Sequence, residues 1–201
     1  MDATDLDALD GTSFLTSLDG TIEAVGANRW NNFAKSNGAP ELTDQSVIGR
    51  SLFEFIAGED VKSQLHHVMS EVAKSDRRTW VMPLNCDSPS HVRNFRQSVT
   101  QVVSQGKCSG LLFQTIELDS RQRPPVNLFD LETMMRRVTD RADFPMIKIC
   151  GWCQKVQNTF ADGVEWLDGE TYYAKGGSSR VQITHGVCPP CNELVLRSLR
   201  D

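Results

Sequence analysis

The sequence predicts an α+β protein, in which an antiparallel five-stranded sheet carries helices on one face and a small cysteine-stapled module follows. One observation behind this prediction is the order of the expected elements, which is two strands, two or three helices and then three strands. A second is a pair of turn-rich hairpin connections, which favour antiparallel neighbours. A third is the distribution of the six cysteines, because four of them lie in the last quarter of the chain.

Two strands and a helix open the folded region. Strands are expected over residues 13–18 and 21–25, because the Asp-Gly pair between them is a strong hairpin turn signal. A helix follows, since Trp30 and Phe33 recur at helical spacing, and the Asn-Gly pair at residues 37–38 supplies a left-handed stop. These elements form the first hairpin and the first helix of the predicted layers.

Further helices are expected before the chain returns to the sheet. Residues 48–56 are typical of a turn that leads into a short helix. Because the helices connect the second strand to the third, they must cross one face of the sheet. The crossing leaves a space that either holds a small ligand or is filled by apolar side chains. The longer helix is indicated by one apolar stripe made of Val61, Leu65, Val68, Met69 and Val72.

Three strands close the predicted sheet. Residues 78–84, 92–103 and 110–118 are strand-like runs, and the last two are joined by a turn-rich loop at residues 104–107. Together with the first hairpin they make five strands. With the helices placed between the second strand and the third, this order predicts an antiparallel sheet that is covered on one face.

Residues 12–119 resemble a PAS domain. The resemblance implies a sensory domain, with a cavity for haem, flavin or a metabolite, or with a surface for PAS–PAS dimerisation. It is carried by the strand, helix and strand order and by the segments Leu18-Asp19-Gly20-Thr21-Ile22, Ala27-Asn28-Arg29-Trp30 with Phe33 and Gly38, Val47-Ile48-Gly49-Arg50-Ser51-Leu52-Phe53 and Ile56-Ala57-Gly58-Glu59-Asp60.

The residues at two positions of the PAS pattern narrow the range of possible ligands. Blue-light PAS domains carry a photoreactive cysteine where this chain has Leu52, which excludes that adduct chemistry unless Cys86 or Cys108 substitutes. Haem PAS domains use a histidine on the longer helix. At ~100° per residue, His66 and His67 lie about 115° and about 145° from the apolar stripe, which predicts that both face solvent. The pattern therefore argues against haem and leaves the PAS ligand unknown.

A linker and a connecting helix are expected over residues 120–143. Residues 120–125 are polar and basic and end in two prolines, which is typical of a linker. The following stripe spans fewer than three heptads, so it favours a connecting helix and leaves open a homodimer through the PAS domain and residues 126–140. The stripe consists of Val126, Leu128, Leu131, Met134, Met135 and Val138.

Residues 144–201 are expected to form a four-cysteine metal module. Cys150 with Cys153, and Cys188 with Cys191, are C-x-x-C pairs, and two such pairs complete a tetrahedron around one ion at ~2.3 Å. Structural zinc contributes folding free energy on the order of 10 kcal/mol, which would order a segment with so small a core. Zinc is therefore the expected cofactor.

Iron and redox chemistry are the alternatives to zinc. The Cys-Pro-Pro-Cys sequence is similar to the knuckle of a rubredoxin-like iron site, in which the residue after each knuckle often needs a left-handed conformation. Asn192 tolerates that conformation, whereas Gln154 is a poor choice for it. A thioredoxin-type dithiol is less favoured, since two pairs are present and no βαβ pattern surrounds them.

Residues 147–194 resemble a short cysteine-rich segment that ends some bacterial PAS-containing sensor proteins. The pattern is Ile-Cys-x-Trp-Cys, then a tryptophan, here Trp166, then Ser/Thr-His-Gly-x-Cys-Pro-x-Cys, which residues 184–191 fit. His185 in this pattern is a fifth candidate donor. It either donates a hydrogen bond towards a thiolate or replaces one cysteine as a ligand.

Composition and charge limit the compartment and the partners. Hydrophobic residues make up 39% of the 201 residues, which suits a globular core, and no stretch approaches a membrane span. The acidic arm at residues 1–11 has no basic residue and is not a signal or transit peptide, so a cytoplasmic protein is expected. The net charge of −5 argues against nucleic acid. The basic group Arg121, Arg123, Arg136, Arg137 and Arg141 is interpreted as a solvated face.

These observations predict a non-enzymatic sensory or signalling protein, with a PAS-like sensory domain over 12–119 coupled to the zinc module at 144–201 and thereby to a protein partner. No nucleophile–base pair stands out in the sequence, and a four-cysteine zinc site leaves no open position for a substrate. A transcriptional regulator that places the cysteine module on DNA, and a redox-responsive switch through the C-x-x-C pairs, are the alternatives.

Overall fold

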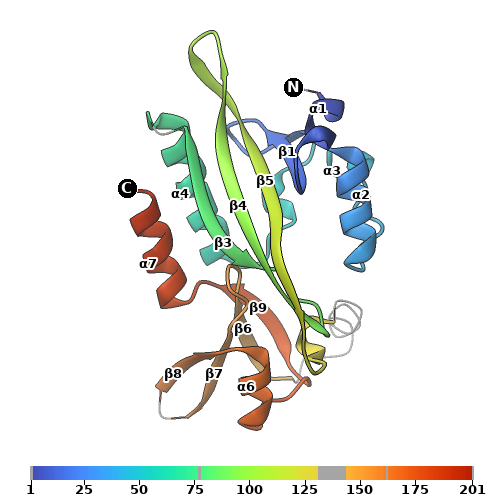
Figure 1. The fold of residues 1–201 in the computed structure, drawn as a ribbon. Helices are drawn as coiled ribbons and strands as arrows, with labels where there is room; N and C mark the ends of the chain where they lie inside the picture. Colours follow the sequence, from blue (N-terminus) through green and yellow to red (C-terminus); the bar gives the residue numbers. More distant parts are fainter. Residues whose placement is uncertain (1, 77, 131–143, 162, 201) are drawn as a thin grey trace.

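A computed structural model describes residues 2–76, 78–130, 144–161 and 163–200 and confirms the α+β prediction. Its larger sheet is five-stranded and antiparallel, with the strand order β2-β1-β5-β4-β3 (Figure 1). The first two strands come from the predicted first hairpin and the last three from the predicted closing runs. The strands are β1 (Thr12–Thr16), β2 (Ile22–Val25), β3 (Thr79–Asn85), β4 (His91–Ser104) and β5 (Lys107–Gln122).

The helices that cross the sheet follow the predicted order. The apolar stripe of the longest helix, α4 (Glu59–Lys74), is buried against the sheet as predicted. The opposite side of α4 carries His66 and His67, which are exposed, and this confirms the predicted orientation of both histidines. Before α4 come the shorter helices α2 (Ala27–Ser36), α3 (Asp44–Val47) and the 3-10 turn η1 (Leu52–Glu54).

The acidic N-terminal segment is a packed helix, α1 (Ala3–Ala8), capped by Asp2. Leu6 of this helix is fully buried, and its carbonyl oxygen accepts a hydrogen bond from Ser13 Oγ at 2.8 Å. Because side chains alternate along a strand, Ser13 points away from Phe14 and from the face that carries α4. Helix α1 therefore contacts the opposite side of β1 from the crossing helices.

Strand β5 extends past residue 120, where the predicted linker starts. Residues 120–122 belong to β5 and pair with residues 91–93 of β4, so backbone pairing continues where the side chains are polar. The next residue, Arg123, is buried, which corrects its assignment to a solvated face. The expected helix is replaced at its start by the 3-10 turn η2 (Asn127–Phe129), after which Asp130 is extended. The remainder of that helix falls at 131–143, outside the described residues.

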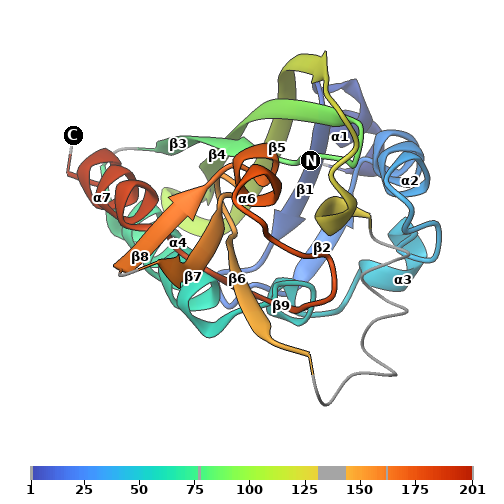
Figure 2. The same ribbon diagram turned by 90° about the horizontal axis from the view of Figure 1, so that it is seen from below.

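The C-terminal segment forms a second, four-stranded sheet with the order β8-β7-β6-β9, in which β6 and β9 are parallel. Figure 2 shows this sheet with its two helices, and α7 lies alongside α4 and β3. None of the helices among the described residues is long and apolar enough to cross a membrane. The elements are β6 (Met146–Cys150), β7 (Val156–Ala161), β8 (Gly163–Leu167), α6 (Gly169–Ala174), β9 (Gln182–Gly186) and α7 (Pro189–Ser198).

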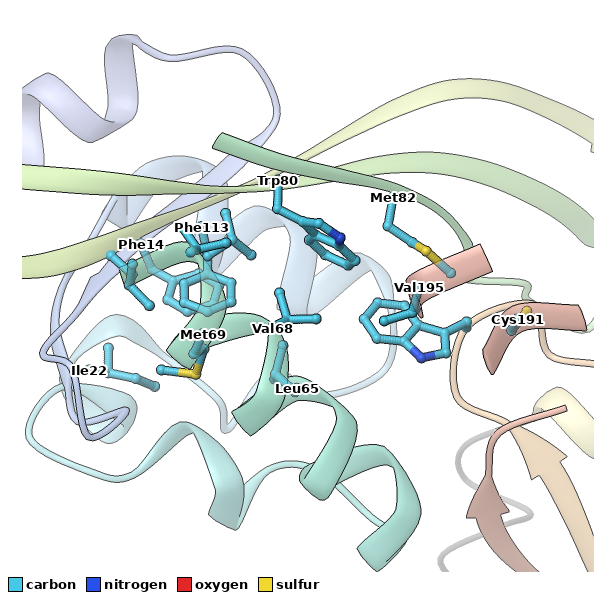
Figure 3. Packing of buried hydrophobic residues seen from close by; sticks show 14 of the residues in the cluster. Phe14, Ile22, Leu65, Val68, Met69, Trp80, Met82, Phe113, Cys191 and Val195 are labelled. Carbon is cyan, nitrogen blue, oxygen red and sulfur yellow. The ribbon is translucent and has the colours of Figure 1, made fainter. Parts of the chain in front are cut away.

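One hydrophobic cluster joins the two sheets. It contains Phe14, Leu65 and Trp80 of the first part together with Cys191 and Val195 of α7 (Figure 3). Two polar contacts reinforce the junction. The indole N–H of Trp80 donates to Ser198 Oγ at 2.8 Å, and the Gln64 amide on α4 donates to Asn192 Oδ1 at 3.0 Å. The cysteine segment is thus packed into the same core as the sheet, while the domain boundary at residue 120 stays a prediction.

Candidate metal centre and the adjoining cavity

The four predicted cysteines converge at one point. Cys150 ends β6 and Cys153 lies in the turn after it, while Cys188 and Cys191 stand at the start of α7. Their four Sγ atoms all lie within 4.8 Å of one another, and Cys153 Sγ is 3.6 Å from Cys188 Sγ. Four sulfurs at ~2.3 Å from one tetrahedral ion would be about 3.8 Å apart. The cluster therefore has the size that a single zinc or iron ion requires.

The first cysteine pair is held in a tight knuckle. The Cys150 N–H donates to the Lys155 carbonyl at 2.8 Å, and the Gln154 N–H donates back to the Cys150 carbonyl at 3.0 Å. Gln154 has φ +55°, a left-handed conformation that costs a residue with a side chain about 1–2 kcal/mol. The sequence argument against this conformation at Gln154 is wrong, because the knuckle hydrogen bonds hold the backbone there.

The second cysteine pair begins a helix. Cys188 is the N-cap residue of α7, and prolines follow at the first helical positions, where a missing N–H costs nothing. The Cys188 N–H donates to Cys150 Sγ at 3.4 Å. An N–H donor and the positive end of a helix dipole both favour thiolates. Asn192 lies within α7 and is not left-handed, so only the first pair forms a knuckle with a left-handed residue behind it.

Proton sharing among the sulfurs shows why the cluster suits a cation. Hydrogen bonds from the thiols of Cys153 and Cys191 and from the Cys188 N–H hold the pKa of Cys150 far below its usual range. The same hydrogen bond to Cys150 raises the pKa of Cys153 to about 12, and the pKa of Cys191 is raised as well. Hydrogen bonding within the cluster thus lowers the pKa of one thiol and raises the pKa of two others. A divalent metal would replace the thiol protons and allow all four thiolates to form.

His185 lies on β9, next to the metal-site strand β6, and pairs in register with Ile149. Burial lowers the pKa of His185, and the charge of Cys150 partly offsets this effect, which places the imidazole close to the cluster. Its Nδ1 atom is buried and has no hydrogen-bond partner among the described residues. The role of His185 as a hydrogen-bond donor to a thiolate or as a replacement ligand stays a prediction.

A cavity of about 430 Å³ lies between the helices and the sheet. At this place the sequence was compatible with either a ligand site or a core filled by apolar side chains. Sheet and helix residues line most of it, including Phe14, Trp30 and Phe113, and Phe55 after η1 also contributes. One wall comes from the metal-site segment and from β9, through Gly151, Trp152 and His185. Leu52 lines the cavity at the place where blue-light PAS domains carry cysteine.

Several residues lie apart from the metal site and the cavity. His66 stacks on Phe53 with ring centroids 3.7 Å apart, and neither His66 nor His67 lines the cavity. Burial raises the pKa of Cys86, which contacts Arg93 at 3.6 Å. Cys108 donates to the Gly110 carbonyl at 3.4 Å. Cys86 and Cys108 are thus not part of the sulfur cluster.

Sequence analysis missed that residues between the metal ligands form a cavity wall. Gly151 and Trp152 occupy the spacer of the first C-x-x-C pair, and a large aromatic residue at such a position was the available signal. It also missed a buried ion pair, in which Arg123 Nη1 is 2.8 Å from Asp87 and 3.5 Å from Glu170 of α6. The contact between Arg123 and Glu170 ties the end of β5 to the C-terminal segment.

No protein-family model matches this chain, and no sequence among the curated proteins matches it either. In fold it is similar to the PAS domain of BvgS from Bordetella pertussis, with a TM-score of 0.46, 11% identity, and 69% of this chain and 91% of that chain covered. A sensory box sensor histidine kinase from Vibrio cholerae aligns with a TM-score of 0.39, 14% identity and coverage of 58% and 87%. The Vibrio cholerae VqmA dimer structure aligns with a TM-score of 0.41 and 17% identity, and the alignment covers 56% of this chain and 48% of that chain.

Proposed function

We propose that this protein is a non-enzymatic sensor, in which the PAS-like sheet binds a small molecule and a zinc ion fixes the C-terminal segment that contacts a signalling partner. The observation that carries the proposal is the meeting of the cavity and the sulfur cluster at one segment. Residues 150–153 supply two sulfurs to the cluster and two residues to the cavity wall. A change in the cavity would therefore reach the segment that bears α7.

Zinc is favoured over iron by the asymmetry of the two cysteine pairs. Only the first pair has a left-handed residue behind it, because Asn192 continues into α7. A rubredoxin-like site would have such a residue after each knuckle. Four thiolates also fill the tetrahedral shell of zinc and leave no open position for a substrate or water, which supports a structural role for the ion.

A redox-responsive switch is the second candidate. The observation that favours it is the 3.6 Å separation of Cys153 Sγ and Cys188 Sγ next to Cys150, whose pKa is lowered by hydrogen bonds from the neighbouring thiols. Loss of two electrons from this pair to a peroxide would form one S–S bond and release the metal, while the peroxide is reduced to water. The fold would then lose the ion that bridges β6 and α7.

Elemental analysis of the purified full chain tests the proposal. We expect about one zinc per chain, its loss in Cys188→Ser and Cys191→Ser, and its retention in the matched controls Cys86→Ser and Cys108→Ser. Iron with a red colour would move the site to electron transfer. A chain with no metal whose fold resists chelation would overturn the zinc assignment and favour the redox switch.

A further inference from the structure

We infer that the cavity is a composite ligand site, built jointly by the PAS-like sheet, α4 and the metal-binding knuckle, which takes a flat, uncharged, mainly aromatic molecule with one hydrogen-bonding group and binds it cooperatively with the metal. The inference rests on the proposed function, because it needs both the ligand cavity and the metal centre. It adds to that function the class of ligand and the control of its affinity.

The knuckle wall is fixed to the sheet and to α4. Trp152 is 5% exposed, and its indole N–H donates to the side chain of Gln64 on α4. The Trp152 carbonyl accepts the N–H of Asn85 on β3 at 2.7 Å. Its ring meets Trp80 edge to face, with centroids 5.8 Å apart. Trp152 therefore ties the knuckle to β3 and α4, and a displacement of the knuckle would disturb these contacts.

Gly151 shows how closely the knuckle backbone approaches α4. A Cβ atom at this position would lie 2.9 Å from a methyl carbon of Val61, which is closer than real Cβ contacts. The backbone between the two cysteines thus rests directly on the helix that lines the cavity. A change in the positions of Cys150 and Cys153 must displace the wall, because no space separates the two.

The lining sets the class of ligand. Phe14 stacks on Phe113 with centroids 4.8 Å apart and meets Trp30 edge to face at 5.7 Å, so these three aromatic rings form a packed group in the cavity lining. Flat aromatic guests pack best between such rings. No Asp, Glu, Lys or Arg is among the described residues that line the cavity. An ionic guest would lose its hydration there without gaining a counterion.

Besides His185, whose buried Nδ1 has no hydrogen-bond partner among the described residues, Gln97 supplies a hydrogen-bonding group to the site. Its side chain lines the cavity, and within the described residues no side-chain hydrogen bond engages it. A primary amide offers a carbonyl acceptor and two N–H donors, so it can pair with a hydroxyl, a carbonyl or a ring nitrogen. The volume of about 430 Å³ lies in the lower part of the ~300–1,000 Å³ range of small-molecule pockets. A bicyclic aromatic molecule suits both features.

Cooperative binding of ligand and metal is expected because neighbouring residues of the knuckle face different sites. Cys150 and Cys153 face the sulfur cluster, whereas Gly151 and Trp152 face the cavity. Metal binding pins the two cysteines and thereby orders the wall. Coupling of this kind is reciprocal, so the metal and the ligand must strengthen each other by the same factor, typically about 5–150-fold.

The ligand class is tested by calorimetry on the zinc-loaded full chain with 2-naphthol as the probe. We expect 2-naphthol to bind at least about tenfold more tightly than 2-naphthoate, its anionic counterpart. It should also bind about fivefold more tightly than naphthalene, and this difference should vanish in Gln97→Leu. Leu84→Trp, which fills the cavity, should abolish binding, while Val81→Trp on the exposed face of the same strand should not. Equal binding of probe and anion, or no binding of the probe, would overturn the assignment.

The coupling is tested by zinc competition against a chromophoric chelator, with and without saturating 2-naphthol. We expect the probe to raise zinc affinity about fivefold or more in the wild-type chain and to leave it unchanged in Leu84→Trp. Zinc affinity that ignores a bound probe would overturn the coupling while the proposed function stands. A chain that binds no zinc at all would instead refute the proposed function.

Discussion

Replacement of Arg123 tests the buried ion pair at the end of β5 most directly. Its side chain is 2% exposed and its Nη1 lies 2.8 Å from Asp87, whose side chain is 8% exposed. The guanidinium also donates to the Ser88 carbonyl at 2.7 Å and stacks over the Phe129 ring at 4.8 Å. Arg123→Ala would therefore leave the Asp87 carboxylate buried without its cation.

The expected cost follows from that environment. Removing one partner of a buried ion pair destabilises a protein by about 3–5 kcal/mol, because the remaining charge has lost its compensation. Among the described residues, the Asp87 carboxylate would keep the hydrogen bond from the Arg93 N–H, at 3.1 Å. A loss of this size is a large part of the ~5–15 kcal/mol that stabilises a typical domain. Replacing both partners, in Arg123→Met with Asp87→Leu, should recover most of it, since apolar side chains need no counterion.

Urea unfolding at fixed zinc concentration, followed by tryptophan fluorescence, measures both changes. The matched control is Arg197→Ala, which breaks an exposed i,i+4 pair with Glu193 and should cost less than about 1 kcal/mol. A cost for Arg123→Ala as small as that of the control would show that the pair is solvated. The assignment of Arg123 and Asp87 as a buried ion pair would then be refuted.

Three further predictions concern the knuckle and its surroundings. Gly151→Ala should lower the free energy of unfolding in urea by about 1–3 kcal/mol through its clash with Val61, and adding Val61→Ala should relieve part of that loss. Strictly additive effects of the two substitutions would contradict the contact. Burial lowers the pKa of His185 below its ordinary value of 6.5, so the unfolded chain takes up the proton at a higher pH than the folded chain, and the free energy of unfolding should fall as the pH drops below about 6.5. His185→Gln should weaken this pH dependence, and an unchanged pH dependence would place the imidazole in solvent. Because a hydrogen bond to Cys150 raises the pKa of Cys153 to about 12, zinc must displace the thiol proton of Cys153. The apparent zinc affinity should therefore fall by about tenfold or more for each pH unit of acidification, and an affinity independent of pH would exclude thiol ligands.

Local patterns in the sequence were sufficient to predict the strands and the crossing helices of the larger sheet. The apolar stripe of α4 and the turn signals between strands are local properties, and the structure follows them closely. The end of β5 was missed because residues 119–122 have polar side chains, and only pairing with β4 makes them a strand. Arg123 was misassigned for a similar reason, since its partners lie in a loop more than thirty positions earlier.

The convergence of the four cysteines was predictable and their surroundings were not. Two C-x-x-C pairs are typical of a metal site, and the four sulfurs do meet, while their role as ligands stays a prediction. Nothing local in the sequence shows that α7 packs on β3 and α4, or that Trp152 reaches the cavity of the other sheet. The left-handed Gln154 was also unexpected, because the knuckle hydrogen bonds outweigh the preference of the residue itself. These features arise from packing between segments that are distant in the chain.

X-ray absorption at the zinc edge of the purified full chain tests the central claim most directly, namely that Cys150, Cys153, Cys188 and Cys191 hold one structural ion at the junction. The account predicts a single shell of four sulfurs at about 2.3 Å. A shell that contains nitrogen or oxygen would contradict the assignment of all four cysteines as ligands, and a chain without zinc would contradict the claim itself.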